Sequence, residues 1–236
     1  MDTSTALVTG ANKGIGKHIA QQLAAAGLTV YVGSRDPERG AKAVAEIGGD
    51  ARLLVLDVTD ATSVAVAAQQ VPALDILVNN AGIMVDGSAA PEASVDSFRR
   101  TYETNLFGVL EVTNAFLPVL RRSPRPRIVN ISSGTGSLAW STGTELSFPK
   151  TGAAAAYRSS KTALNALTLF YAQSLADDGF KVNALAPGLR ATDLNAHAAS
   201  GDDPAEAAAA AVRLALLPDD GPTGEFISWD DTSVPW

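Results

Sequence analysis

Tyr157 and Lys161 are the two side chains whose types and spacing most clearly suggest chemistry. They lie four residues apart in an alanine-rich stretch with helical periodicity, so both are expected on one face of a helix. An ammonium group beside a phenol favours the phenolate, and Lys161 should therefore lower the pKa of Tyr157 from its free value of about 10. Such a tyrosine can exchange a proton with a carbonyl or alcohol oxygen. The alternative is a surface tyrosine with a solvated lysine, because this spacing is common by chance.

A glycine-rich segment near the start of the chain has the pattern of a phosphate-binding loop. It runs from Thr9 to Gly16, follows the apolar run Ala6-Leu7-Val8 and opens an amphipathic stretch from Lys17 to Ala26. Glycines allow a sharp turn close to an anion, and a helix start offers unpaired N–H groups to it. A glycine triplet alone is a weak signal, and it gains weight from Ser133, Asn105 and the Tyr157–Lys161 pair. The candidate residues of the loop are Gly10, Asn12, Lys13, Gly14, Ile15 and Gly16.

Composition limits the possible function classes. The 236 residues are 46% hydrophobic and 18% charged, which fits one globular domain over residues 1–236. The net charge of −7 argues against nucleic acid or an anionic membrane as a partner. The absence of cysteine excludes disulfides and thiolate sites, and two isolated histidines, His18 and His197, predict no metal site. Residues 1–5 do not resemble a leader and no apolar run is long enough to span a membrane, so we expect a cytoplasmic protein.

Short apolar runs alternate with longer alanine-rich helical stretches. This alternation predicts a single-domain α/β Rossmann fold, with a doubly wound seven-stranded parallel sheet and helices on both faces. The expected strands are Thr5–Val8, Thr29–Gly33, Arg52–Leu56, Ile76–Asn79, Ile128–Ile131, Lys181–Ala184 and Glu225–Ser228. The expected helices are Ile15–Ala26, Pro37–Ile47, Ala61–Gln70, Val95–Arg121, Ala154–Ala176 and Pro204–Leu216. Polar and small residues follow the strands, where such sheets bind ligands. The long excursion 189–217 is either a substrate-side lid or a surface connection.

Several separate motifs resemble those of the short-chain dehydrogenases/reductases. They occur in that family's order from residue 9 to beyond residue 190, and the tail from Gly221 to Phe226 resembles the carbonyl-reductase branch. The matching residues are Thr9, Gly10, Gly14, Gly16, Asp57, Asn79, Asn80, Ala81, Gly82, Asn105, Ser133, Tyr157, Lys161, Pro187 and Gly188. The resemblance implies that Tyr157 is the general acid, that Ser133 holds the carbonyl oxygen and that Asn105 anchors a water linked to Lys161. Lys161 would also hold the nicotinamide ribose. Ser132 is the competing serine, and we expect it to satisfy the strand end instead.

The resemblance also implies a dinucleotide site along the ends of the strands. Asp57, with Val58 beside it, would accept from the adenine amino group, and Asn80 with Ala81 and Gly82 would lie against the adenine ribose. Each of these residues has a plain alternative, a helix cap for Asp57 and a turn for Asn80. Pro187, Gly188 and Thr192 would contact the nicotinamide carboxamide and the phosphates.

The second strand predicts a preference for NADP(H). NAD-specific sites end this strand with an acidic residue, whereas this chain has Ser34 followed by Arg35. Together with Lys13 in the loop, a guanidinium suits a 2′-phosphate. Asp36 should instead cap the next helix ahead of Pro37. Arg39 is a weaker candidate, because a solvated helix arginine is the simpler reading.

The connection from Ser133 to Tyr157 is expected to shape the substrate pocket. We hypothesise that Trp140, Phe148, Met84 and the segment 189–200 line an apolar pocket for an aldehyde or ketone, with Leu138 and Leu146 nearby. Alternatively, Trp140 and Phe148 only anchor the loop.

Oligomeric state and the detailed activity stay open at this level. In relatives, the two longest predicted helices commonly form a dimer face, whereas in the carbonyl-reductase branch the inserted loop can cover that face. A homodimer, a homotetramer and a monomer are therefore all compatible with the sequence. The sequence predicts an NADPH-dependent oxidoreductase that acts on a small carbonyl or alcohol substrate. The alternatives are a non-catalytic NADP-binding redox sensor on the same fold, and an epimerase or dehydratase, which would need a longer substrate region.

Overall fold

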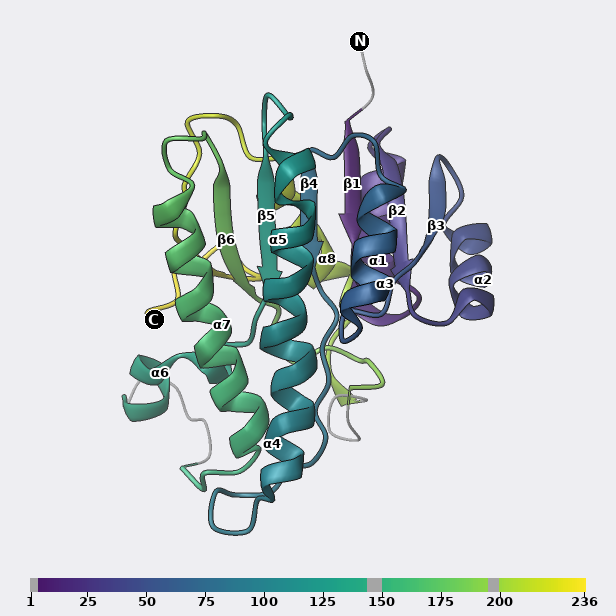
Figure 1. Ribbon diagram of the computed structural model, residues 1–236. Coiled ribbons are helices and arrows are strands. Elements are labelled where there is room, and N and C mark those ends of the chain that lie inside the picture. Colours follow the sequence, from purple (N-terminus) through teal and green to yellow (C-terminus); the bar gives the residue numbers. More distant parts are fainter. Residues whose placement is uncertain (1–3, 144–149, 195–199) are drawn as a thin grey trace.

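One parallel sheet of seven strands forms the centre of the molecule. The computed structural model describes residues 4–143, 150–194 and 200–236. The strand order is β3-β2-β1-β4-β5-β6-β7, and the two halves of the sheet meet where β1 pairs with β4 (Figure 1). The predicted doubly wound α/β fold is thereby confirmed. The strands are β1 Thr5–Val8, β2 Thr29–Ser34, β3 Ala51–Val55, β4 Ile76–Asn79, β5 Arg127–Ile131, β6 Lys181–Ala186 and β7 Phe226–Ser228.

Helices cover both faces of this sheet. Figure 1 shows α3, α5 and α7 in front of the sheet and α8 behind it. The helices are α1 Gly14–Ala25, α2 Pro37–Ile47, α3 Ala61–Gln69, α4 Val95–Tyr102, α5 Gly108–Leu120, α6 Leu138–Thr142, α7 Ala155–Ser174 and α8 Pro204–Ala215. Among the described residues, none of these helices combines the length and apolarity needed to cross a membrane.

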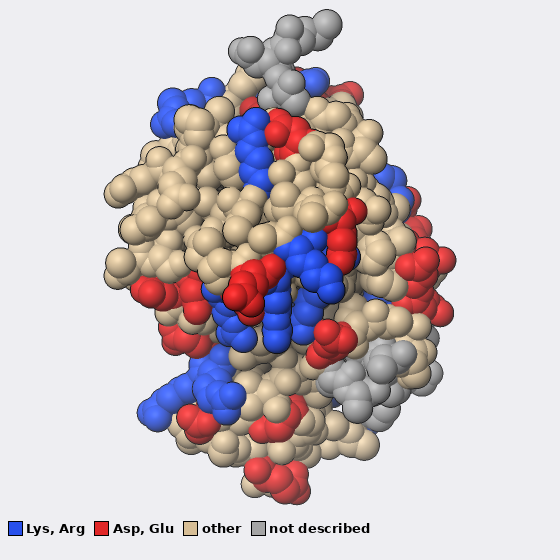
Figure 2. Space-filling view, turned by 90° about the vertical axis from the view of Figure 1, so that its right-hand side faces the viewer, with Lys and Arg blue, Asp and Glu red and all other residues tan. Residues whose placement is uncertain are grey.

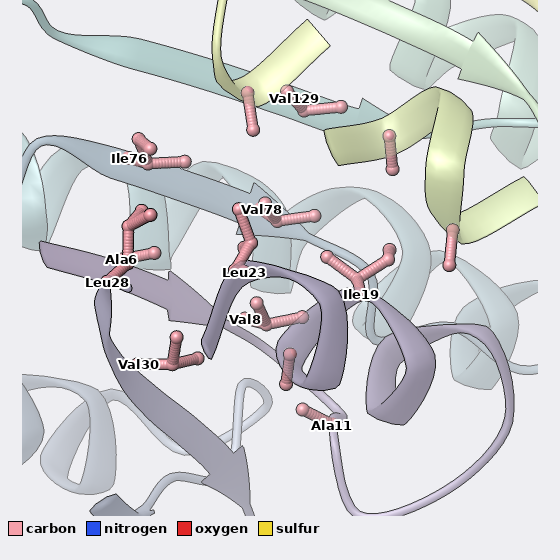
Figure 3. Close-up of a cluster of buried hydrophobic side chains, with 14 of the residues drawn as sticks. Ala6, Val8, Ala11, Ile19, Leu23, Leu28, Val30, Ile76, Val78 and Val129 are labelled. Carbon is pink, nitrogen blue, oxygen red and sulfur yellow. The ribbon is translucent and has the colours of Figure 1, made fainter. Parts of the chain in front are cut away.

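Two hydrophobic cores, one on each face, hold the layers together. Successive strand residues point to opposite faces, so Leu7 joins the core under α3, α5 and α7, whereas Ala6 and Val8 join the core under α1 and α8. Figure 3 shows this second core, in which Ile19 and Leu23 of α1 pack onto the strands. Burial on both faces explains why the strands read as continuous apolar runs.

The predicted element bounds agree with the structure to within two residues, with one exception. The predicted helix Val95–Arg121 is wrong as a single element, because a π-helical turn, Glu103–Phe107, separates α4 from α5. Two short elements were also missed, the 3₁₀ turn Gly134–Gly136 and α6. Asp36 caps α2 as predicted, accepting from the backbone of Glu38 and Arg39 at 3.0 and 3.1 Å.

Candidate active site

Tyr157 and Ser133 meet at the carboxyl end of β5. Tyr157 lies in the first turn of α7, and its hydroxyl shares a hydrogen bond with the Ser133 side chain. The Ser133 hydroxyl lies 2.9 Å from that of Thr135. Ala154, just before α7, has a φ of +55°, a left-handed conformation that is unfavourable for alanine. Its N–H donates to Gly87 O at 3.0 Å, so the chain after β4 fixes the start of the helix that carries Tyr157.

The predicted lowering of the Tyr157 pKa is wrong. Burial raises the pKa of Tyr157 to about 12, and the hydrogen bond with Ser133 offsets only part of that effect. Tyr157 as a whole residue is half-buried. With a pKa of about 12, Tyr157 is therefore a protonated phenol at neutral pH.

Lys161 lies one helical turn after Tyr157 and is buried. Its Nζ is 5.8 Å from the centre of the Tyr157 ring and donates to the carbonyl of Ile131 at 2.8 Å. Burial lowers the pKa of Lys161 to about 8. The expected shared helix face is confirmed, but the lysine is turned toward the end of β5 as well as toward the phenol.

Asn105 reaches the same place from the π-helical turn. Its side chain accepts from Ile83 N at 2.8 Å, and donates to Ile83 O at 2.9 Å and to Ser160 Oγ at 3.0 Å. A Cβ on Gly82 would lie 3.4 Å from Asn105 Oδ1 and 3.5 Å from Lys161 Nζ, so these three residues are close neighbours. The two bonds to Ile83 fit the plainer reading of Asn105 as a side chain bonded to backbone, and they place it beside Lys161. Its role as the anchor of a water stays a prediction.

Ser132 and Ser133 have different surroundings. Ser132 is buried and its hydroxyl donates to the side chain of Asn165, whereas Ser133 faces Tyr157. The Ser132 hydroxyl is thus bonded to helix α7 and not to the strand end that we expected it to satisfy.

The glycine-rich loop has the geometry of an anion cradle. Gly10 and Gly14 have φ values of +63° and +55°, and a Cβ on Gly16 would come within 2.2 Å of Asn80 Nδ2. Asn80 in turn donates to Thr9 O at 2.8 Å, so it braces the loop. Helix α1 has no side-chain cap at Lys13, unlike α2, α3, α4 and α8. Its first N–H groups are thus open to a phosphate.

A basic pocket lies between this loop and α2. It has a volume of about 230 Å³ and is lined by Asn12, Lys13, Arg39, Lys42, Ala43 and Glu46. Figure 2 shows the side of the molecule on which α2 lies, where basic side chains cluster near the centre, bordered by acidic ones. Arg39 and Lys13 each pair with one carboxylate, on Asp36 and Asp193.

The structure separates the two residues at the end of β2. Arg35 is exposed and forms no ion pair within the described residues, whereas the buried Ser34 hydroxyl donates to Asp36 O at 2.8 Å. Sequence reasoning missed Lys42 in the basic pocket. It follows Arg39 by three residues on a helix, and that spacing could have revealed it.

The remaining predicted residues also lie at strand ends. Asp57 holds the turn after β3 by accepting from Thr59 N at 3.0 Å, and Asp60, not Asp57, caps α3. Val58 packs closely against Gly108, and Thr192 lies beside Gly14, within 3.4 Å of where a Cβ would stand. Pro187 and Gly188 form the turn after β6, with a φ of +72° at Gly188.

The substrate-side hypothesis gains little support. Trp140 packs against the small core of Ala184, Ala186, Phe226 and Val234, which favours the anchoring alternative for this residue. Leu138 is exposed and Met84 is half-buried. Leu146, Phe148 and residues 195–199, including His197, lie outside the described residues.

Comparisons with known proteins agree with this geometry. Residues 4–203 match the family model described as short chain dehydrogenase. The chain is 36% identical to (−)-isopiperitenone reductase from Mentha piperita, with 95% of this chain and 96% of that protein covered. It is 34% identical to salutaridine reductase from Papaver bracteatum, covering 97% and 95%. NADPH-bound carbonyl reductase from chicken fatty liver has a similar structure, with a TM-score of 0.86, 29% identity and all of both chains covered.

Proposed function

Because this chain belongs to the short chain dehydrogenase family, we propose that it is an NADPH-dependent carbonyl reductase in which Tyr157 is the general acid. The observation that carries the proposal is the meeting of three side chains at the end of β5: the phenol of Tyr157, the hydroxyl of Ser133 and the buried ammonium of Lys161. They stand at the same edge of the sheet as the glycine-rich loop, where dinucleotides bind to such folds.

The loop and the basic pocket fit a phosphorylated dinucleotide. The open N–H groups of α1 and the crowded Gly16 suit a pyrophosphate, and Lys13, Arg35, Arg39 and Lys42 offer cations for a 2′-phosphate. Along the sheet edge, Asp57 and Asn80 would hold the adenosine end, whereas Lys161, the Pro187–Gly188 turn and Thr192 would hold the nicotinamide end. When bound, the dinucleotide supplies the hydride.

The protein's own part is to hold the carbonyl and to deliver the proton. Ser133 would donate a hydrogen bond to the carbonyl oxygen, and Tyr157 would pass its phenolic proton to that oxygen as hydride reaches the carbonyl carbon. The cation of Lys161 would stabilise the phenolate left behind, and Asn105 would anchor a water through which the proton is replaced. Oxygen gains one proton and carbon one hydride, which gives a neutral alcohol.

The substrate class follows from the site and from the relatives. Relatives named for the reduction of isopiperitenone and salutaridine, together with a carbonyl reductase, support an aldehyde or ketone with a hydrophobic body. We expect the activity in the cytoplasm.

The test follows NADPH absorbance with a panel of aldehydes and ketones. Carbonyl-dependent oxidation is expected, and Tyr157→Phe should lower turnover by about 10²–10⁴-fold while NADPH still binds. Tyr171→Phe is the matched control, because its hydroxyl, on the same helix, contacts exposed Asn114 at 2.7 Å. NADPH binding without turnover across the panel would instead indicate a redox sensor, and undiminished turnover in Tyr157→Phe would refute the assignment of the acid.

A further inference from the structure

Arg190 is a buried arginine in the segment that follows the turn after β6. Only 1% of its side chain is exposed. Its Nε donates to Pro187 O at 2.7 Å, and its Nη1 donates to Glu206 Oε2 at 2.6 Å. The centre of its guanidinium lies 4.3 Å from the ring of Trp229. One side chain thus connects the turn, helix α8 and the residue that follows β7.

A buried guanidinium is costly and cannot lose its charge. Glu206 supplies the opposite charge, and the face of Trp229 supplies a cation–π contact. The remaining nitrogen, Nη2, is buried without a hydrogen-bond partner in the described part of the chain. A buried ion pair often contributes no more to stability than a pair of apolar residues would, so the burial of Arg190 calls for a further explanation.

The arginine and the tryptophan enclose the turn itself. A Cβ on Gly188 would lie 3.0 Å from Trp229 Cδ1 and 3.4 Å from Arg190 Nη2. Trp229 N donates to Ala186 O at 2.9 Å, which fixes the tryptophan to the end of β6. The path of Pro187 and Gly188 is therefore set from two sides.

The backbone around Arg190 also closes the base of the excursion 189–217. Ala191 N donates to Asp202 O at 2.8 Å, and Asp202 N donates to Leu189 O at 3.1 Å. Gly201 lies against the backbone of Arg190, where a Cβ would come within 2.6 Å. The two chain segments at this base, residues 189–191 and 201–202, are therefore fixed to each other and to the turn.

We propose that Arg190, held by Glu206 and Trp229, is a positioning residue for the nicotinamide end of the cofactor site. It acts through the Pro187–Gly188 turn, and the inference rests on the proposed function for the identity of the ligand at that turn. Most of the residues proposed for the pyrophosphate and adenosine ends come from other elements, and the Asp193–Lys13 ion pair that joins this segment to the glycine-rich loop is exposed. We therefore expect the larger effect of Arg190 at the nicotinamide end of the dinucleotide. A displacement of about 1 Å at a reacting group can cost about 10²-fold in rate.

The test separates the two ends of the cofactor. Arg190→Met should bind 2′,5′-ADP, which has no nicotinamide, within about twofold of the wild type. The same variant should lower kcat at least tenfold and weaken the rise in nicotinamide fluorescence when NADPH binds. Arg213→Met is the matched control, because it removes an exposed α8 arginine that pairs with Asp231 and contacts Trp229 O. This control should behave as the wild type.

Glu206→Gln provides a second, milder variant that keeps the shape of the contact but removes its charge. It should also bind 2′,5′-ADP almost as the wild type does, with a weaker rise in nicotinamide fluorescence and a smaller loss of kcat than Arg190→Met. Unchanged kcat and nicotinamide fluorescence in both variants would overturn the inference. A parallel loss of 2′,5′-ADP binding would overturn it too, because the role would then be structural. The two binding measurements need no turnover, so they stand even if the wild type reduces no carbonyl.

Discussion

Lys13 Nζ lies 3.2 Å from Asp193 Oδ2, which joins the glycine-rich loop to the excursion after β6 across 180 residues of sequence. Both side chains are largely exposed, 57% for the lysine and 76% for the aspartate. Lys13 also borders the basic pocket proposed for the 2′-phosphate. The carboxylate of Asp193 and a bound phosphate would therefore compete for the same ammonium group.

Asp193→Asn should tighten NADPH binding and leave NADH binding unchanged. An exposed ion pair is worth at most about 1 kcal/mol, so the dissociation constant for NADPH should fall by no more than about fivefold. Titrations with both cofactors at low salt measure the difference, and high salt should reduce it. Equal changes for the two cofactors would contradict the competition.

Arg35→Asp should weaken NADPH binding by an order of magnitude or more. The change replaces an exposed cation at the end of β2, which forms no ion pair with any described residue, with a carboxylate that repels a 2′-phosphate. NADH, which lacks that phosphate, should bind at least as well as before. The KM for each cofactor is the measurement, and an unaltered KM for NADPH would show that Arg35 does not meet the phosphate.

Gly16→Ala should damage the loop through simple crowding. The added methyl group would stand 2.2 Å from Asn80 Nδ2 and 2.9 Å from Gly10 O, so the loop must shift. Overpacking of this kind costs about 1–3 kcal/mol, and we expect NADPH binding to weaken at least tenfold. Gly87→Ala is the control, since among the described residues its Cβ would come within 4 Å of Met84 Cε alone, at 3.8 Å. Equal melting temperatures and affinities for the two variants would disprove the crowding argument.

The sequence predicts the sheet and the main site residues because both depend on local patterns. Alternation of apolar runs and helical stretches fixes the element order, and a four-residue spacing fixes the shared face of Tyr157 and Lys161. The structure adds the contact between Ser133 and Tyr157. Such a contact is consistent with the resemblance to the family, which implies that both side chains act on one carbonyl oxygen.

The features that were missed depend on contacts between distant segments. The hydrogen bonds of Asn105 to Ile83, made from the π-helical turn, join residues 22 positions apart. The pKa of Tyr157 is set by burial, which helix spacing does not report. Arg190 lies in an alanine-rich segment that the sequence predicts as a lid or a surface connection, and its burial depends on contacts with distant residues, among them Trp229 and Glu206.

Asn105→Ala should destabilise the fold as well as the site. It removes three hydrogen bonds made by a buried side chain and leaves both backbone groups of Ile83 without that partner. A buried donor or acceptor left without a hydrogen-bond partner costs about 1–3 kcal/mol, so we expect the free energy of unfolding to fall by roughly 2–4 kcal/mol. Asn114→Ala, which removes one exposed contact to Tyr171, is the control. Urea unfolding measures both variants, and a loss no larger than that of the control would contradict the role of these hydrogen bonds.

Lys161→Met should stabilise the cofactor-free protein at pH 7 while it abolishes turnover. Burial lowers the pKa of Lys161 from its ordinary 10.5 to about 8, so below pH 8 the fold must bury a charge. A depression of that size corresponds to about 3 kcal/mol, and the lost hydrogen bond to Ile131 reduces the net gain. Between pH 8 and 10.5 the unfolded chain binds more protons at this residue than the folded chain. The stability of the wild type should therefore rise with pH relative to the variant, and the advantage of the variant should shrink. Urea unfolding at pH 7 and pH 9.5 measures this, with exposed Lys42→Met as the control. A difference between wild type and Lys161→Met that does not change with pH would show that burial does not lower the pKa of Lys161.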